Sequence, residues 1–115
     1  MQENDAAPVR YAGPKFALIP EWVLFADISD RAVRLYGVLL RFADHQTREA
    51  WPTRRRLAER VRVKDRRSVD KALGELMRIG ALKMYPRWRN SLNEVVEEYD
   101  AAHPIRTSSG YELHG

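Results

Sequence analysis

The stretch from Trp51 to Leu82 predicts two helices joined by a tight turn, and this pair constrains the fold more than any other feature. Thr53 is placed to cap the first helix, whose apolar stripe is Leu57, Ala58 and Val61. A break at 62–64 precedes Asp65, the expected cap of the second helix, and Gly80 closes it. The second helix has the apolar stripe Val69, Ala72, Leu73, Leu76 and Met77.

Basic and polar side chains gather at the N-termini of both predicted helices. The first helix opens with Arg54, Arg55 and Arg56, and the second with Arg66, Arg67, Ser68, Asp70 and Lys71. A helix N-terminus offers free backbone N–H donors and the positive end of a dipole, so added arginines favour phosphate binding. A short turn followed by a helix with such an N-terminal face predicts a helix-turn-helix, whose second helix lies in a DNA major groove.

Charge is concentrated on this helix pair. Residues 51–90 carry 13 basic and 4 acidic side chains, a net charge of +9, whereas residues 1–50 and 91–115 have net charges of −1 and −4. Such a field would steer a polyanion toward the helix pair. The alternative, a basic face that is simply solvated, stays open at this point.

The whole chain has 115 residues, which suits one domain. We expect a single domain over 15–115, preceded by a polar, disordered arm over 1–14. No stretch approaches the roughly 20 apolar residues of a membrane span, and the polar start resembles no signal peptide, so we expect no membrane partner. With no cysteine, the expected location is the cytoplasm, in association with the nucleoid.

The segments before the helix pair predict the elements on which the pair packs. Residues 16–19 are expected to be extended, Pro20 to start a short helical turn, and Trp22 to act as a core or lid aromatic. Ser29 is placed to cap a helix running to about Asp44, in which Gly37 indicates close approach of another helix. A polar connector follows over 45–50, and Trp51 is expected to fill the core.

After Gly80 the pattern changes to that of strands. Residues 81–88 and the closing residues 108–115 predict two strands that pair as a wing, which makes the fold mainly α with a small antiparallel β wing, an α+β winged helix-turn-helix. The segment between them fits either a helical stripe or a strand. We favour a strand over 94–100 that pairs back toward 106–113 through a turn at 101–104.

The pattern Trp51-Pro52, Leu57-Ala58, then Val69, Ala72, Leu73, Leu76, Gly80 and Leu82 resembles the winged-helix domains of bacterial plasmid and phage replication initiators and related helix-turn-helix transcriptional regulators. The resemblance covers residues 16–113 and includes the closing RTSSGYEL, which is similar to their wing. It implies DNA binding through the helix starting at Asp65. The chain departs from the family in its long acidic segment within the wing, and we expect it to have no second domain.

The candidate DNA-binding residues fall into three groups. Arg66, Arg67, Ser68 and Lys71 are candidates for base edges and adjacent phosphates, with Lys64 in the turn beside them. Asp70 would accept from cytosine N4 or pair with Arg66 or Arg67 within its helix. Arg54, Arg55 and Arg56 are expected on phosphates, whereas Arg87, Arg89 and Arg106 are either wing contacts or ordinary surface charge.

No residues predict catalysis, a cofactor or a metal site. His45, His103 and His114 are far apart, and Glu94, Glu97, Glu98 and Asp100 favour a solvated acidic face. We therefore expect a non-enzymatic protein whose partner is double-stranded DNA, with a homodimer left open. The alternative is a protein-interaction winged helix that docks an acidic partner on its basic face. The acidic segment 94–100 would be a further surface for a protein partner.

Overall fold

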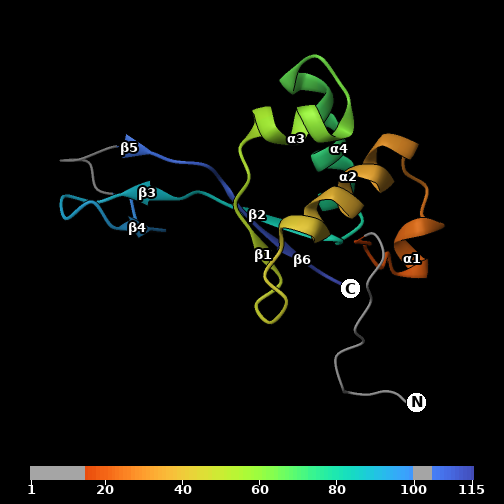
Figure 1. Ribbon diagram of the computed structural model, residues 1–115, viewed down its shortest axis with the longest axis horizontal. Coiled ribbons are helices and arrows are strands. Elements are labelled where there is room, and N and C mark those ends of the chain that lie inside the picture. The colour runs from red at the N-terminus through yellow and green to blue at the C-terminus, as the bar shows by residue number, and fades with distance from the viewer. Residues whose placement is uncertain (1–14, 100–104) are drawn as a thin grey trace.

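The computed structural model describes residues 15–99 and 105–115, which form four helices and two small antiparallel sheets (Figure 1). The helices are α1 (Glu21–Leu24), α2 (Asp30–Phe42), α3 (Arg54–Val61) and α4 (Arg66–Arg78). One sheet has the order β1-β6-β2, with β1 at Glu49–Ala50, β2 at Leu82–Tyr85 and β6 at Gly110–Leu113. The other has the order β4-β3-β5, with β3 at Trp88–Arg89, β4 at Val95–Val96 and β5 at Ile105–Arg106. None of the helices described is long and apolar enough to cross a membrane.

The three long helices begin at the predicted caps. Ser29 accepts from the Ala32 N–H at 3.1 Å, and Thr53 and Asp65 accept from the third residues of α3 and α4, each at 3.0 Å. Helix α2 ends at Phe42, two residues before the predicted end. These side chains satisfy backbone donors that a helix start leaves unpaired, so they fix where each helix begins.

Gly80 ends α4 as predicted. Its φ of +78° is left-handed, the Gly80 N–H donates to the Met77 carbonyl, and the Ala81 N–H donates to the Leu76 carbonyl. This pair of bonds is a Schellman motif, which satisfies the last carbonyls of the helix and turns the chain into β2.

The core lies between α2, α3, α4 and the β1-β6-β2 sheet. The predicted apolar stripes of α3 and α4 are buried, except that Met77 is 42% exposed, which corrects the prediction for that residue. Met77 lies at the edge of the buried stripe of α4. Strand β6 adds Tyr111 and Leu113, and the largest fully buried side chains are Tyr36 and Tyr111.

Two predictions for the N-terminal segments need correction. Trp22 is 42% exposed and is not a core aromatic, because the single turn of α1 buries only Val23, while residues 16–19 belong to no helix or strand. A Cβ atom on Gly37 would lie 3.3 Å from the Ile19 Cδ1 atom, so the close neighbour is a side chain of the entry segment and not another helix. The prediction of disorder for residues 1–14 lies outside the described residues.

The connector before α3 also differs from the prediction. Its last two residues, Glu49 and Ala50, form β1 and pair with Glu112 and Tyr111 of β6. Trp51 is 47% exposed and does not fill the core. Its indole N–H instead donates to the Tyr85 hydroxyl at 3.1 Å.

The two predicted wing strands do pair, from Leu82 with Leu113 to Tyr85 with Gly110. The predicted pairing of 94–100 with 106–113 is wrong, because β4 and β5 lie on opposite edges of β3. A turn at 90–94 folds β4 back onto β3: Asn93 has a φ of +63°, and the Asn90 side chain accepts from the Leu92 and Glu94 N–H groups. The proposed turn at 101–104 lies in the part of the chain that is not described.

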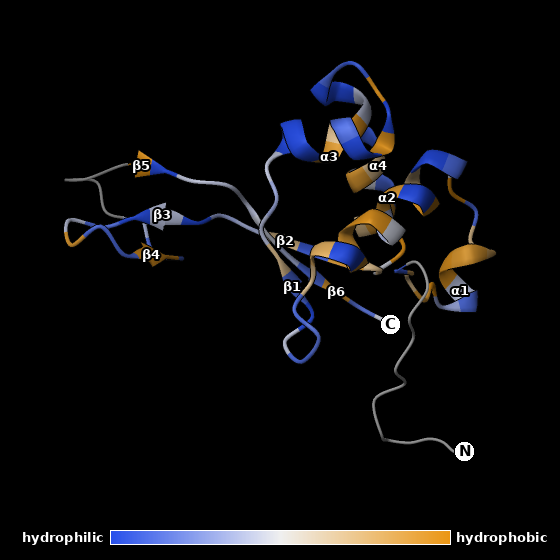
Figure 2. Ribbon diagram, in the orientation of Figure 1, coloured by the Kyte–Doolittle hydropathy of each residue, from blue (hydrophilic) through white to orange (hydrophobic). Residues whose placement is uncertain are grey.

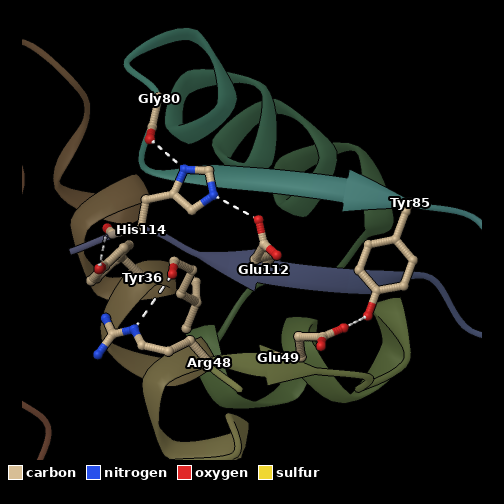
Figure 3. A network of polar contacts seen from close by, with 8 residues as sticks. Tyr36, Arg48, Glu49, Gly80, Tyr85, Glu112 and His114 are labelled. Atoms are coloured by element: carbon tan, nitrogen blue, oxygen red, sulfur yellow. Dashed lines mark hydrogen bonds and ion pairs between the residues drawn. The ribbon is translucent and has the colours of Figure 1, made fainter. Parts of the chain in front are cut away.

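The β4-β3-β5 sheet, which forms the outer part of the wing, projects away from the helices (Figure 1). Where β2 and β6 lead into this sheet, the Tyr85 ring occupies the space that a Cβ atom on Gly110 would take, so a larger residue at this position of β6 would displace the ring. The Tyr85 hydroxyl donates to Glu49, which joins the end of β2 to β1 (Figure 3).

His114 closes the other end of the sheet (Figure 3). Its Nδ1 atom lies 3.0 Å from the Gly80 carbonyl oxygen and its Nε2 atom 2.9 Å from a Glu112 carboxylate oxygen. Because both neighbours are acceptors, both ring nitrogens donate only when the imidazole is protonated. The Glu112 contact, followed by the Gly80 carbonyl, raises the pKa of His114, and His114 lowers the pKa of Glu112.

We expect His114→Ala to lower the free energy of unfolding more at about pH 6 than at about pH 8. Because folding raises the His114 pKa above 6.5, its contribution is fully present below pH 6.5 and is lost as the pH rises through the raised pKa. Urea denaturation of both proteins at the two pH values measures this difference. An equal loss at both values would contradict the ionic contact.

Candidate nucleic-acid interface

A short turn separates α3 from α4. Arg62 ends α3 in the left-handed region with a φ of +68°, and the Val63 N–H donates back to the Ala58 carbonyl. The chain then reaches the Asp65 cap, so the predicted break at 62–64 is confirmed. Most residues of α3 are hydrophilic, whereas those of α1 are mostly hydrophobic (Figure 2).

A cavity of about 500 Å³ lies where the N-termini of α3 and α4 meet the segment that joins β5 to β6. Its lining residues are Thr53, Arg54, Arg55, Arg66, Arg106, Thr107, Ser108 and Ser109. Four guanidinium groups line this cavity, and none of its lining residues carries a carboxylate. Because like charges repel and the hydroxyl groups supply further donors, the cavity is suited to an anion.

Arg54 forms the most enclosed part of this site, with a side chain only 18% exposed. Its Nε atom donates to the Asp70 Oδ1 atom at 2.8 Å, and its NH1 group donates to the Tyr111 hydroxyl. The guanidinium also lies 5.6 Å from the centroid of the Tyr111 ring. Burial raises the pKa of Tyr111, so its phenol stays neutral and accepts the bond.

The partner of Asp70 corrects one prediction. Asp70 was expected either to accept from cytosine N4 or to pair with Arg66 or Arg67 within its own helix, and the ion pair that it makes is with Arg54 of α3. The two residues are 16 positions apart, and only the packing of α3 on α4 brings them together.

Other basic residues of the helix pair make fewer contacts within the protein than Arg54 does. Within the described part of the chain, the side chains of Lys64, Arg66, Arg67 and Lys71 are exposed and make no hydrogen bond or ion pair. Arg55 has only a loose 3.8 Å contact with Glu59, and the Arg56 guanidinium lies 5.3 Å from the Phe42 ring centroid. Ser68 donates its backbone N–H to the Asp65 cap.

The three wing arginines occupy different positions relative to the cavity. Arg106 lines the cavity, lies 5.3 Å from the Trp88 ring centroid and donates to Ser109. Arg87 lies over the Trp51 ring and donates to Ser108, but it does not itself line the cavity. Arg89 donates to the Asn93 carbonyl in the wing turn. The structure thus brings Arg106, and not Arg87 or Arg89, into the anion cavity with Arg54, Arg55 and Arg66.

Sequence reasoning did not include the hydroxyl residues of the cavity among the site residues. Thr107, Ser108 and Ser109 lie between β5 and β6, and the run of small hydroxyl residues before Tyr111 was the available signal. Ser108 donates to the Trp51 carbonyl, which ties this segment to the entry of α3.

The described acidic residues of the wing are not among those that line this cavity. Glu94, Glu97 and Glu98 are exposed on the wing, and Asp100 lies outside the described residues. Among residues 15–99 and 105–115, no three histidine, aspartate or glutamate side chains gather as metal ligands would.

Residues 26–80 match the family model of a helix-turn-helix domain. The match spans α2, α3 and α4 with the turns between them, and it ends at the glycine that closes α4. It supports a helix-turn-helix DNA-binding domain and does not extend to the wing. Comparisons with curated proteins and with solved structures gave no match.

Phosphate is expected to stabilise the protein more than chloride does at matched ionic strength, because an anion in the cavity would relieve the repulsion among its arginines. About 1 kcal/mol of binding energy would raise the Tm of such a domain by roughly 4 °C. Thermal unfolding of wild-type protein and of Arg66→Ala/Arg106→Ala measures the effect. We expect the double variant to lose it and Arg34→Ala, on an exposed position of α2, to keep it. A phosphate effect of equal size in all three proteins would contradict the site.

Proposed function

We propose that this protein binds double-stranded DNA in a sequence-specific manner, with α4 in the major groove and the anion cavity on a backbone phosphate. The observation that carries the proposal is the convergence of four guanidinium groups at the joint N-termini of a helix-turn-helix pair. The match to a helix-turn-helix domain supports the same function.

The exposed face of α4 supports base recognition. Val69, Ala72, Leu73 and Leu76 bury one side of the helix, so Arg66, Arg67 and Lys71 stand on its free side. Because these side chains make no bond within the described chain, they are free to reach base edges. A bidentate arginine on guanine is the commonest specific contact in DNA complexes.

The cavity supports contacts that position the protein. Arg55 and Arg66 come from the helices, and Arg106 comes from the wing root, so one phosphate there would touch all three parts of the interface. Such contacts carry no sequence information themselves, but they set the register of α4 on the duplex.

We further propose a role as a transcriptional regulator or as the DNA-recognition module of a plasmid or phage replication or maintenance system. The resemblance of the pattern from Trp51 to Leu82 to such domains supports this role. A homodimer on a palindrome belongs to the same proposal. No catalytic step is involved in any of these roles.

The wing favours a second candidate, the docking of a protein partner. Its turn, β4 and the segment after β4 expose the apolar residues Leu92, Val95 and Tyr99 beside Glu94, Glu97 and Glu98. A partner bound there would stay bound at a salt concentration that abolishes DNA binding, because apolar burial is not screened by salt.

Selection from a randomised double-stranded DNA pool at near-physiological salt is expected to enrich one motif. On that motif Arg67→Ala should cost roughly 1 to 3 kcal/mol, and less on random DNA. Arg34→Ala, the control outside the interface, should bind as wild type does. Retention of DNA without any enriched motif would contradict sequence-specific binding.

Arg106→Ala should lower the salt dependence of binding, because the wing root loses one phosphate contact. The slope of log K against log salt concentration should fall by about 0.9, by the same amount on the motif and on random DNA. Binding titrations at several salt concentrations measure both slopes. An unchanged slope would show that Arg106 does not contact a DNA phosphate.

A further inference from the structure

Asp70 is an acidic group on the helix that we propose approaches DNA. It lies on the exposed side of α4 and is 52% exposed. A carboxylate on this face repels phosphate oxygens. The other acidic residue of α4, Glu75, has a different role, because it accepts from the backbone N–H and hydroxyl of Ser29.

The carboxylate of Asp70 is held in one orientation by Arg54. The Arg54 Nε atom donates to Oδ1 at 2.8 Å, while the described chain offers Oδ2 no hydrogen bond. Arg54 is fixed in turn by Tyr111, which is fully buried and accepts from the NH1 group. The result is a chain of three side chains, from the core through Arg54 to one free carboxylate oxygen on the surface of α4.

A free carboxylate oxygen only accepts hydrogen bonds, which limits what it recognises in a major groove. Cytosine presents its N4 amino donor there, whereas guanine presents the acceptors N7 and O6 and thymine presents the acceptor O4. Adenine presents its N6 donor beside the acceptor N7, which a carboxylate repels. Cytosine is therefore the base that this oxygen fits.

We propose that Asp70 reads the N4 amino group of a cytosine, and that Arg54 and Tyr111 are positioning residues that fix its carboxylate. This inference rests on the proposed DNA-binding function and specifies one base of its target. Arg54 thereby differs from its neighbour Arg55, whose exposed side chain has only a loose ionic contact.

The test compares motifs selected from randomised duplex DNA by wild-type protein, Asp70→Asn, Arg54→Lys and Tyr111→Phe. Wild-type protein should prefer cytosine at one position by about tenfold over other bases. Asp70→Asn should shift that position toward adenine, because asparagine pairs with adenine N6 and N7. Arg54→Lys and Tyr111→Phe should weaken the same preference and leave the other positions unchanged.

The matched control is Arg34→Lys, which makes the same change on an exposed position of α2, outside the interface, and should leave all positions unchanged. Circular dichroism checks that each variant folds. A probe that carries 2-pyrimidinone, which lacks the 4-amino group, in place of this cytosine tests the contact with wild-type protein alone, and its affinity should fall about tenfold.

The outcomes separate the two proposals. If wild-type protein enriches no motif, the proposed DNA-binding function fails. If it enriches a motif whose positions are all unaffected by Asp70→Asn, or if the affected base is not cytosine, this inference fails and the DNA-binding function stands. A uniform loss of affinity in Arg54→Lys, with the cytosine preference retained, would show that Arg54 holds α3 against α4 and does not position the Asp70 carboxylate for base recognition.

Discussion

The arrangement of the interface depends on the burial of Tyr111. This residue lies in β6, between Ala50 of β1 and Met84 of β2, and its ring is wholly enclosed in the core. Its hydroxyl reaches Arg54 at the start of α3. A single side chain thus joins the sheet that carries the wing to the helix pair. The wing root and the helix N-termini are held in a fixed relation, and the anion cavity exists between them.

The cavity shows how stability and function are connected in this chain. Four guanidinium groups around one space repel one another, and the folded protein offsets only part of this repulsion. Asp70 pairs with Arg54, and Arg106 lies over the Trp88 ring. Arg66 has no such partner in the described chain. A bound phosphate would offset the remaining repulsion, so the charges that destabilise the free protein would stabilise the complex.

Local signals in the sequence predicted the helices well, because a cap acts within three residues of the helix start. Ser29, Thr53, Asp65 and Gly80 each act as expected. Pairings between distant segments were not predictable in the same way. The two residues of β1 carry no strand pattern and pair only because β6 lies beside them. Likewise, the partner of Asp70 depends on how α3 packs on α4, which no spacing within α4 reveals.

The location of the interface is the central claim, and an NMR titration of isotope-labelled protein with a duplex carrying its selected motif tests it most directly. The account predicts that the largest amide shifts lie at residues 53–56, 65–71 and 106–109, and that the exposed acidic segment of the wing changes little. Shifts concentrated at residues 92–99, with the N-termini of α3 and α4 unaffected, would contradict it.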